Sequence, residues 1–286
     1  MENRSRAASL YDELIRDNAM TDEVVRYVRK TWRGSGSGGM VANVIVGAMI
    51  ALLYVWMISS IVKWNLFITL GIEYVELAVV TLVAPASIYA AISGEREKAT
   101  WDALVLTRLT PAQIIAGKLA WRVAMLLGVM ALLLLPLLVS QMQRGMGEFP
   151  DASGVLLGQG LIFAWGLLLT AFSLWVSART ARSVTSIGII ISAVIGVLAM
   201  LPALLSAFGL SFGAEQPRSA WDVMSTWILA LNPFVLLGAV SEGERVLGRS
   251  AMTSPSTALM VILLYLVAAA LFVLLTHRTV KRLSGE

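Results

Sequence analysis

The sequence predicts an all-α polytopic membrane protein with six transmembrane helices and both termini in the cytoplasm. Of the 286 residues, 58% are apolar and only 14% are charged, whereas a soluble domain is about half apolar and about a quarter charged. Six helices of about 20 residues each would place close to half of the chain in lipid. The remaining segments are too short for a separate catalytic domain of the usual size. An ordinary soluble enzyme is therefore excluded.

Six long apolar runs are the predicted spans. They cover residues 40–62, 66–92, 111–139, 154–177, 184–210 and 257–276. Most reach the roughly 18–20 residues that separate a spanning helix from a buried soluble one. Nothing in them alternates with the period of two that a membrane β-barrel requires, so we expect helices.

Prolines and glycines inside the runs predict how the helices pack. Pro85 and Pro202 lie inside two of the spans, and we expect neighbouring helices to hydrogen-bond the carbonyls that each proline frees. The glycines of the fourth span suit close packing at a bundle or dimer seam. They are Gly154, Gly158, Gly160 and Gly166.

The lysines and arginines predict the orientation. If the N-terminus is inside, 17 of the 22 Lys and Arg residues fall in inner segments. The outer segments then hold Lys63, Arg144, Arg218, Arg245 and Arg249. Because membrane proteins concentrate these residues on the cytoplasmic side, we expect a multi-pass protein of the cell (cytoplasmic or inner) membrane with both ends inside. The bias also explains the net charge of +4, so nucleic acid is not expected as a partner.

Three parts are expected along the chain. Residues 1–39 form a cytoplasmic segment without a cleavable signal peptide. It contains a helix that starts after Thr21 and lies on membrane lipid or packs on another subunit, and then a Gly/Ser hinge. Residues 40–276 form the transmembrane domain, with an inner segment at 93–118 and an outer segment at 211–256. Residues 277–286 are a basic cytoplasmic tail.

The outer segment 211–256 is partly apolar. Its 14-residue apolar stretch is too short to span and is broken at Asn232-Pro233. An Asn cap with Pro at the first helical position predicts the start of a helix. We expect either two short helices in or on the outer leaflet, or a packed loop.

Several kinds of chemistry are excluded or unsupported. Cysteine is absent and His277 is the only histidine, so disulfides and thiolate metal sites are excluded and a histidine metal centre is disfavoured. The spans offer no nucleophile with a facing base, and we assign no catalytic residue, metal or cofactor to this chain. Gly117-Lys118 is followed by Leu119, so the GxxxxGK[ST] phosphate loop is missing. ATP would have to bind to another chain.

Glu73 and Glu76 are the only acidic residues in the predicted spans. Their spacing of three places them on one helix face. Counting back from residue 92 at about 1.5 Å per residue puts Glu73 near the outer boundary of the membrane. We expect a pair in contact with water at an outer mouth, where ionisation costs little. The alternative is an outer vestibule that attracts a cationic group or relays protons.

The inner segment 93–118 carries the strongest functional signal. It begins with alternating charges at residues 95–98, and the helical spacing of its apolar residues predicts a short helix at 100–107. Thr110-Pro111-Ala112-Gln113 is a capping box that starts the next span. The result is a helix, a tight turn and a helix at the inner surface, with apolar side chains that need a partner.

This segment resembles the inner loop of ABC-2 type transporter permeases. The residues that carry the resemblance are Glu95, Thr100, Trp101, Asp102, Leu104, Thr107, Leu109, Thr110, Ile114, Gly117 and Lys118. The family has a Glu-rich start, Gly-Thr, a leucine-rich short helix, a Thr-Pro motif and Gly-Lys at the opening of the next span. Ala99 stands where the family usually has Gly, and Arg108 where it usually has Pro. The six-span plan and the broken outer segment extend the resemblance along most of the chain.

The resemblance implies a permease subunit that encloses a path together with a second permease subunit, in a homodimer or heterodimer. Separate ATPase subunits would bind ATP and Mg²⁺. The helix at 101–107 would be the coupling element that seats in a groove of the ATPase, and the charged residues Glu95, Arg96, Glu97 and Asp102 would form pairs at its rim. The family favours export, and the apolar spans are compatible with lipid, peptide, drug or polysaccharide cargo. Two alternatives are a non-transporting membrane anchor or sensor that recruits or regulates an ATPase, and a membrane-embedded enzyme.

Overall fold

The computed structural model describes residues 68–106, 109–143, 152–207, 227–242 and 254–284, with a few positions between 52 and 59. These parts contain helices, turns and bends and no strand, so the predicted all-α class is confirmed for them. The expected N-terminal segment, the Gly/Ser hinge and most of the expected first span lie outside the described residues. The helices are α4 (Ile68–Ala86), α5 (Ser93–Glu97), α6 (Trp101–Val105), α7 (Pro111–Gln143), α8 (Ala152–Arg179), α9 (Ser183–Ile195), the π-helical turn η2 (Gly196–Met200), α10 (Leu201–Ala207), α12 (Pro233–Glu242) and α14 (Pro255–Leu283).

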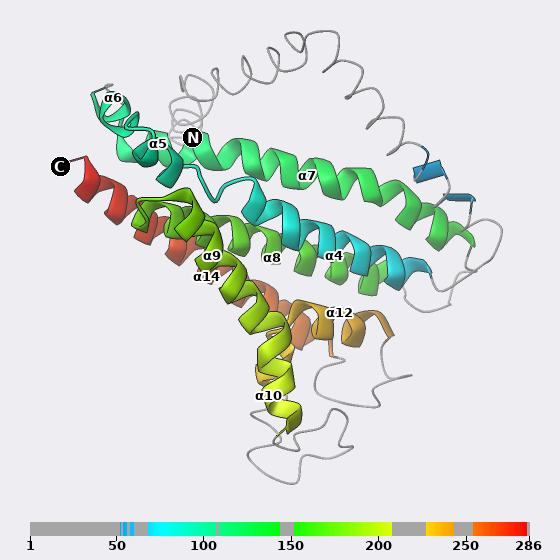
Figure 1. Cartoon of the computed structure of the whole chain (residues 1–286). Coiled ribbons are helices and arrows are strands. Elements are labelled where there is room, and N and C mark those ends of the chain that lie inside the picture. The colour runs from blue at the N-terminus through cyan, green and yellow to red at the C-terminus, as the bar shows by residue number, and fades with distance from the viewer. Residues whose placement is uncertain are drawn as a thin grey trace, which may run out of the picture.

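Within the described residues, four helical segments are long and apolar enough to cross a membrane. They are Pro111–Val139 in α7, Ser153–Arg179 in α8, Ser183–Leu204 from α9 into α10, and Pro255–Leu283 in α14. The protein is therefore membrane-embedded and multi-pass. Helix α4 packs along α7 and α8, as Figure 1 shows.

The second predicted span, 66–92, is wrong at its C-terminal end. Helix α4 ends at Ala86, and residues 87–92 form tight turns that lead into α5. Pro85 has no N–H with which to continue the helical ladder. Its carbonyl accepts from the Ile88 N–H at 3.1 Å, and the Ile88 carbonyl accepts from the Ala91 N–H at 2.9 Å.

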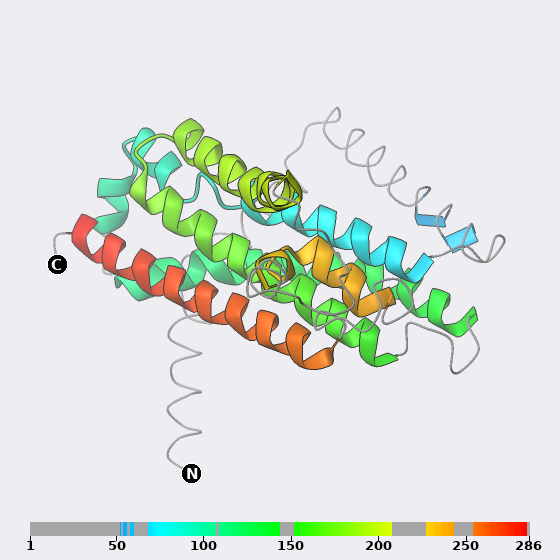
Figure 2. The same ribbon diagram turned by 90° about the horizontal axis from the view of Figure 1, so that it is seen from below.

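Helix α8 lies at the centre of the bundle. Half of the residues in the most apolar stretch of α8 are buried inside the protein. In the corresponding stretch of α9 and α10 only 6% are buried. The core around it combines Leu161 and Trp165 of α8 with Leu77 of α4, Leu237 of α12 and Tyr265 of α14. Helices α8 and α14 run side by side in both views (Figures 1 and 2). This burial of apolar surface is the main stabilising contact among the described elements.

The expected repair of a proline break is confirmed in the apolar segment Ser183–Leu204. Pro202 cannot donate to the carbonyl of Leu198, four residues earlier. That carbonyl instead accepts from the side-chain amide of Asn232, with a nitrogen–oxygen distance of 3.1 Å. The Asn232 side-chain oxygen accepts from the Phe234 N–H at 3.0 Å, so the predicted Asn cap of α12 is also confirmed.

Gly166→Ala should destabilise the bundle by about 1–3 kcal/mol, because it overpacks a filled core. A Cβ at Gly166 would lie 2.8 Å from one methyl of Leu126 and 2.9 Å from a methyl of Val80. The matched control is Gly160→Ala on the same helix, where the nearest side-chain atom, in Ile262, is 3.4 Å away. Thermal unfolding in detergent should show a lower midpoint for the first variant and no loss for the second. Equal midpoints would contradict this account of the α4–α7–α8 contact.

The polar ends of several helices gather at one end of the bundle. Helices α5 and α6, the starts of α7 and α9, and the C-terminal end of α14 lie together there (Figures 1 and 2). The basic residues of the last turn of α14, Lys281 and Arg282, belong to this end, as does Arg179 at the end of α8. Segments that are distant in sequence thus form one polar surface.

Candidate functional site

The elbow, residues 93–106, lies between α4 and α7 in the chain and contains the short helices α5 and α6. Between them Ala99 turns the chain with a φ of 55°, in the left-handed region that favours glycine. The Thr100 N–H donates to the carbonyl of Glu95 at 2.9 Å, which closes the turn. The short helix predicted at 100–107 is confirmed as α6, Trp101–Val105. Thr107 and Arg108 lie outside the described residues.

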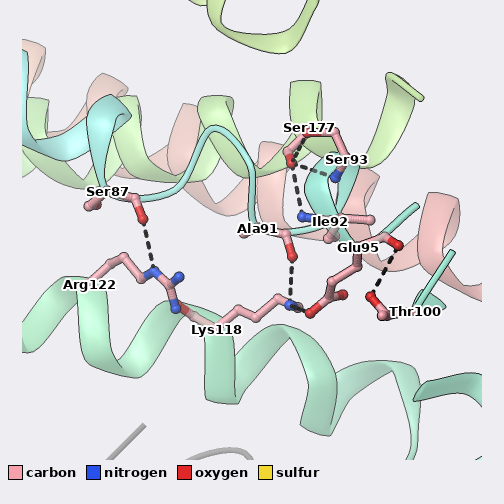
Figure 3. Close-up of polar contacts among 9 residues, drawn as sticks. All are labelled: Ser87, Ala91, Ile92, Ser93, Glu95, Thr100, Lys118, Arg122 and Ser177. Atoms are coloured by element: carbon pink, nitrogen blue, oxygen red, sulfur yellow. Dashed lines mark hydrogen bonds and ion pairs between the residues drawn. The ribbon is translucent and has the colours of Figure 1, made fainter. Parts of the chain in front are cut away.

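Ser177 of α8 ties the start of the elbow to the centre of the bundle. Its hydroxyl oxygen accepts from the backbone N–H groups of Ile92 and Ser93, each at 3.0 Å. Both N–H groups belong to the N-terminal end of α5, where a helix has no internal acceptors for its first donors. Ser93 and Ser177 are fully buried, so these bonds replace water that cannot reach the site. Figure 3 shows Ser177 directed at the first turn of α5.

An ion pair links the elbow to α7. The ammonium of Lys118 lies 2.6 Å from a carboxylate oxygen of Glu95 and donates to the carbonyl of Ala91, also at 2.6 Å. The side chain of Lys118 is only 6% exposed and that of Glu95 is 28% exposed. A pair with this little access to water holds its partners in one geometry, because either charge alone would be poorly solvated.

Two further contacts attach the elbow to the junction of α8 and α9. The Arg96 guanidinium donates to the carbonyl of Thr180 at 3.1 Å. The Glu97 carboxylate accepts from the Ser183 hydroxyl and from the Ser183 N–H at 3.0 Å. These two hydrogen bonds lower the pKa of Glu97. A carboxylate at this first turn also suits the positive end of α9.

Trp101 is not the exposed contact residue that the inner-segment prediction required. It is only 5% exposed and packs in a cluster with Ile92, Ile115 of α7, Leu174 of α8 and Val280 of α14. The expectation that the apolar side chains of this helix need an outside partner is therefore wrong for Trp101, because apolar residues of three long helices converge where α6 returns to the bundle. Leu104 is half-buried in the same cluster.

The exposed surface of α6 is formed by other residues. Leu106, directly after the helix, is 86% exposed. Thr100, Asp102 and Ala103 are also exposed. One large apolar side chain thus stands among small and acidic residues at the tip of the elbow.

The predicted capping box is confirmed at the start of α7. The Gln113 side-chain oxygen accepts from the Thr110 N–H at 2.9 Å, and the Thr110 hydroxyl accepts from the Gln113 N–H at 3.3 Å. Pro111 occupies the first helical position. Leu109, the residue before Thr110, is half-buried.

Glu73 and Glu76 lie far from the elbow, in the other half of α4, and both are fully buried. The expected contact with water is therefore not found. The Gln159 amide of α8 donates to Glu76 at 2.7 Å. A Cβ at Gly158 would lie 2.6 Å from a carboxylate oxygen of Glu73, so this glycine lets the carboxylate approach α8 closely. An outer vestibule at this pair stays a prediction.

Sequence reasoning missed the partners that hold the elbow. Ser177 lies in an apolar run, and Ser183 and Thr180 lie in an ordinary polar turn, so no local pattern singled them out. For Lys118, the sequence indicates only an inner basic residue and the Gly-Lys pair that opens the next span. Within the described ranges, no group of three or more His, Asp or Glu residues is placed to hold a metal ion.

No protein family model matches the chain, and no curated protein matches its sequence.

Proposed function

We propose that this chain is the permease subunit of an ATP-driven ABC-2 type transporter. It has six spans in the cell membrane, with both termini in the cytoplasm. A second permease subunit completes the path through the membrane, and a separate ATPase subunit binds ATP and Mg²⁺ and docks on the elbow. The chain itself is not an enzyme. Export is the favoured direction.

The observation that carries the proposal is the rigid attachment of the elbow. Ser177 fixes the elbow to α8, Lys118 fixes it to α7, and Ser183 fixes it to α9. Each of these helices contains a segment that is long and apolar enough to cross a membrane. A force applied at the tip of α6 is therefore passed to three such helices together, which is what a hinge or shear motion of a transporter needs.

The turn at Ala99 gives separate support to the resemblance. The ABC-2 inner loop usually has Gly at this position, and the φ of 55° at Ala99 lies in the region where glycine is favoured. The backbone at position 99 thus has the conformation that glycine favours, although the residue here is alanine.

The tip of the elbow has the character of a docking surface. Leu106 is 86% exposed at the polar end of the bundle, and the exposed acidic residue Asp102 lies one helical turn before it. An apolar anchor with charges around it is the usual arrangement of a protein interface, in which the anchor supplies affinity and the charges select the partner.

The experiment uses Leu106→Glu in the full-length chain, purified in mild detergent from its native membrane. The wild-type chain should co-purify with a polypeptide that contains a GxxxxGK[ST] loop, and the preparation should hydrolyse MgATP. Burial of a leucine contributes about 1.5–3 kcal/mol, so we expect the variant to retain at most about a tenth of the bound ATPase.

Val184→Asp is the matched control. Val184 is 75% exposed at the same end of the bundle, and an acidic residue in the first turn of α9 is tolerated. The control should keep the ATPase. Absence of ATPase from the wild-type preparation, or equal retention by Leu106→Glu, would contradict the proposal. ATP-dependent transport into sealed inverted vesicles separates a permease from a non-transporting anchor.

A further inference from the structure

A shallow, narrow groove lies between α4 and α7. Its walls are apolar over most of their length, formed by Val80, Val83, Ala84, Met125, Leu126 and Val129. At its polar end it is closed by Ser87 and Arg122. The groove therefore has an apolar body and one cationic end, and both helices that form it belong to the membrane bundle.

The bonding of Arg122 leaves its charge available. Its Nη1 donates to the carbonyl of Lys118 at 2.9 Å and its Nε lies 3.4 Å from the carbonyl of Ser87. Both acceptors are neutral, and no carboxylate accepts from Arg122 in the part of the chain that the structure describes. A guanidinium has five N–H donors in a planar fork, so donors remain for an outside acceptor. Figure 3 shows the side chain reaching from α7 toward the end of α4.

The neighbouring charges leave the site positive. Lys118 lies one turn before Arg122 on the same helix and is paired with Glu95. Two cations and one carboxylate give a local charge of +1, and Arg122 is the cation that faces the groove. A phosphate group matches this end in charge, and its geometry matches the bidentate fork of arginine.

The depth of Arg122 matches the level of lipid headgroups. A hydrocarbon layer of about 30 Å needs about 20 helical residues. Counted back from Val139, the last residue of the apolar segment of α7, this length ends beside Trp121 and Arg122. Trp121 is 40% exposed, and exposed tryptophans favour the membrane interface.

We propose that the α4–α7 groove binds one anionic phospholipid of the cytoplasmic leaflet, with its phosphate at Arg122 and an acyl chain along the apolar walls. Basic pockets between membrane helices on the cytoplasmic side bind anionic lipid headgroups in this way. The inference rests on the proposed orientation but not on the ATPase or on transport. It concerns a resident lipid and makes no statement about cargo.

The test measures lipid selectivity directly. The full-length chain is reconstituted in vesicles of equal parts phosphatidylglycerol and phosphatidylcholine, extracted in neutral detergent, and its retained lipids are counted by native mass spectrometry. We expect the wild-type chain to retain one phosphatidylglycerol with about tenfold preference, the effect of a charge-assisted hydrogen bond. Arg122→Gln should bring the preference near unity. Arg179→Gln should keep it, because Arg179 lies over the ring of Trp175 and outside the groove.

A second pair of variants tests the apolar walls without touching the charge. Met125 is exposed and lines the groove, and Leu127 is exposed on the same helix outside it. Met125→Trp should fill the groove and lower retention of the lipid, whereas Leu127→Trp should not.

The lipid site would be overturned if the wild-type chain retained the two lipids equally, or if Arg122→Gln kept the selectivity. It would also be overturned if an equal concentration of inorganic phosphate displaced the lipid, because that would indicate a site for a soluble anion. None of these readings depends on ATP hydrolysis, so loss of the lipid site and loss of the proposed transporter function are distinguishable.

Discussion

Trp101→Ala is expected to release the elbow from the end of the bundle. The side chain is 5% exposed and fills a cluster formed with α7, α8 and α14. Truncation of a buried aromatic residue of this size costs about 3–5 kcal/mol. Because the elbow is a short appendage of the bundle, we expect this cost to appear mainly as local opening of residues 93–106.

Hydrogen–deuterium exchange measures that opening. Each 1.4 kcal/mol corresponds to about a tenfold change in an equilibrium constant, so protection of the elbow amides should fall by about a hundredfold or more. Trp121→Ala is the matched control, since Trp121 is 40% exposed on α7. It should leave exchange at the elbow unchanged. Normal protection in Trp101→Ala would show that the buried tryptophan does not hold the elbow in place.

Lys118→Met should also loosen the elbow, by leaving the carboxylate of Glu95 beside an apolar side chain. Breaking a buried ion pair by removing one partner costs about 3–5 kcal/mol. The side chain of Glu95 is 28% exposed, so water partly solvates the carboxylate that is left alone. We therefore expect a loss of stability of about 2–3 kcal/mol. The readout is the midpoint of denaturation in detergent, together with protease sensitivity of the elbow.

The double variant Lys118→Met with Glu95→Gln separates charge from packing. Removing both charges should recover most of the loss, because no uncompensated ion remains. Lys98→Met is the control, since Lys98 is exposed at the end of α5. Additive losses in the double variant would mean that the two residues act independently, contrary to the ion pair at 2.6 Å.

Trp101→Ala, Lys118→Met and Leu106→Glu together distinguish three roles in and around the elbow. Trp101 attaches the elbow to the bundle, Lys118 fixes its orientation, and Leu106 faces outward. A substitution at Trp101 or Lys118 that abolishes ATPase binding would therefore be ambiguous, because it would also move the elbow. Only Leu106→Glu tests docking while leaving the buried contacts intact.

The sequence alone predicted the four long apolar helices that could cross a membrane in the described residues. Long apolar runs identify membrane helices because lipid offers no partner for exposed backbone groups. Helix starts were predictable at Thr110-Pro111 and Asn232-Pro233, since a cap bonds to groups within three residues of itself. The end of α4 at Ala86 was not predicted, because the apolar composition continues beyond Pro85 while the helix does not.

The tertiary structure decided which side chains of those helices are buried. Spacing alone put the apolar residues of α6 on a helix but could not tell that Trp101 faces the bundle, because that depends on where α7, α8 and α14 meet. The same holds for Glu73 and Glu76, whose common face was predictable but whose burial against Gly158 and Gln159 was not.

The composition, the apolar runs and the local caps thus determined an all-α membrane protein and the starts of α7 and α12, because these signals act over one or two turns of chain. The attachment of the elbow was decided only in three dimensions. Ser177 lies 84 residues after Ser93, and Ser183 lies 86 residues after Glu97. A single hydroxyl or carboxylate fixes such a contact, and it leaves no periodic pattern in the sequence.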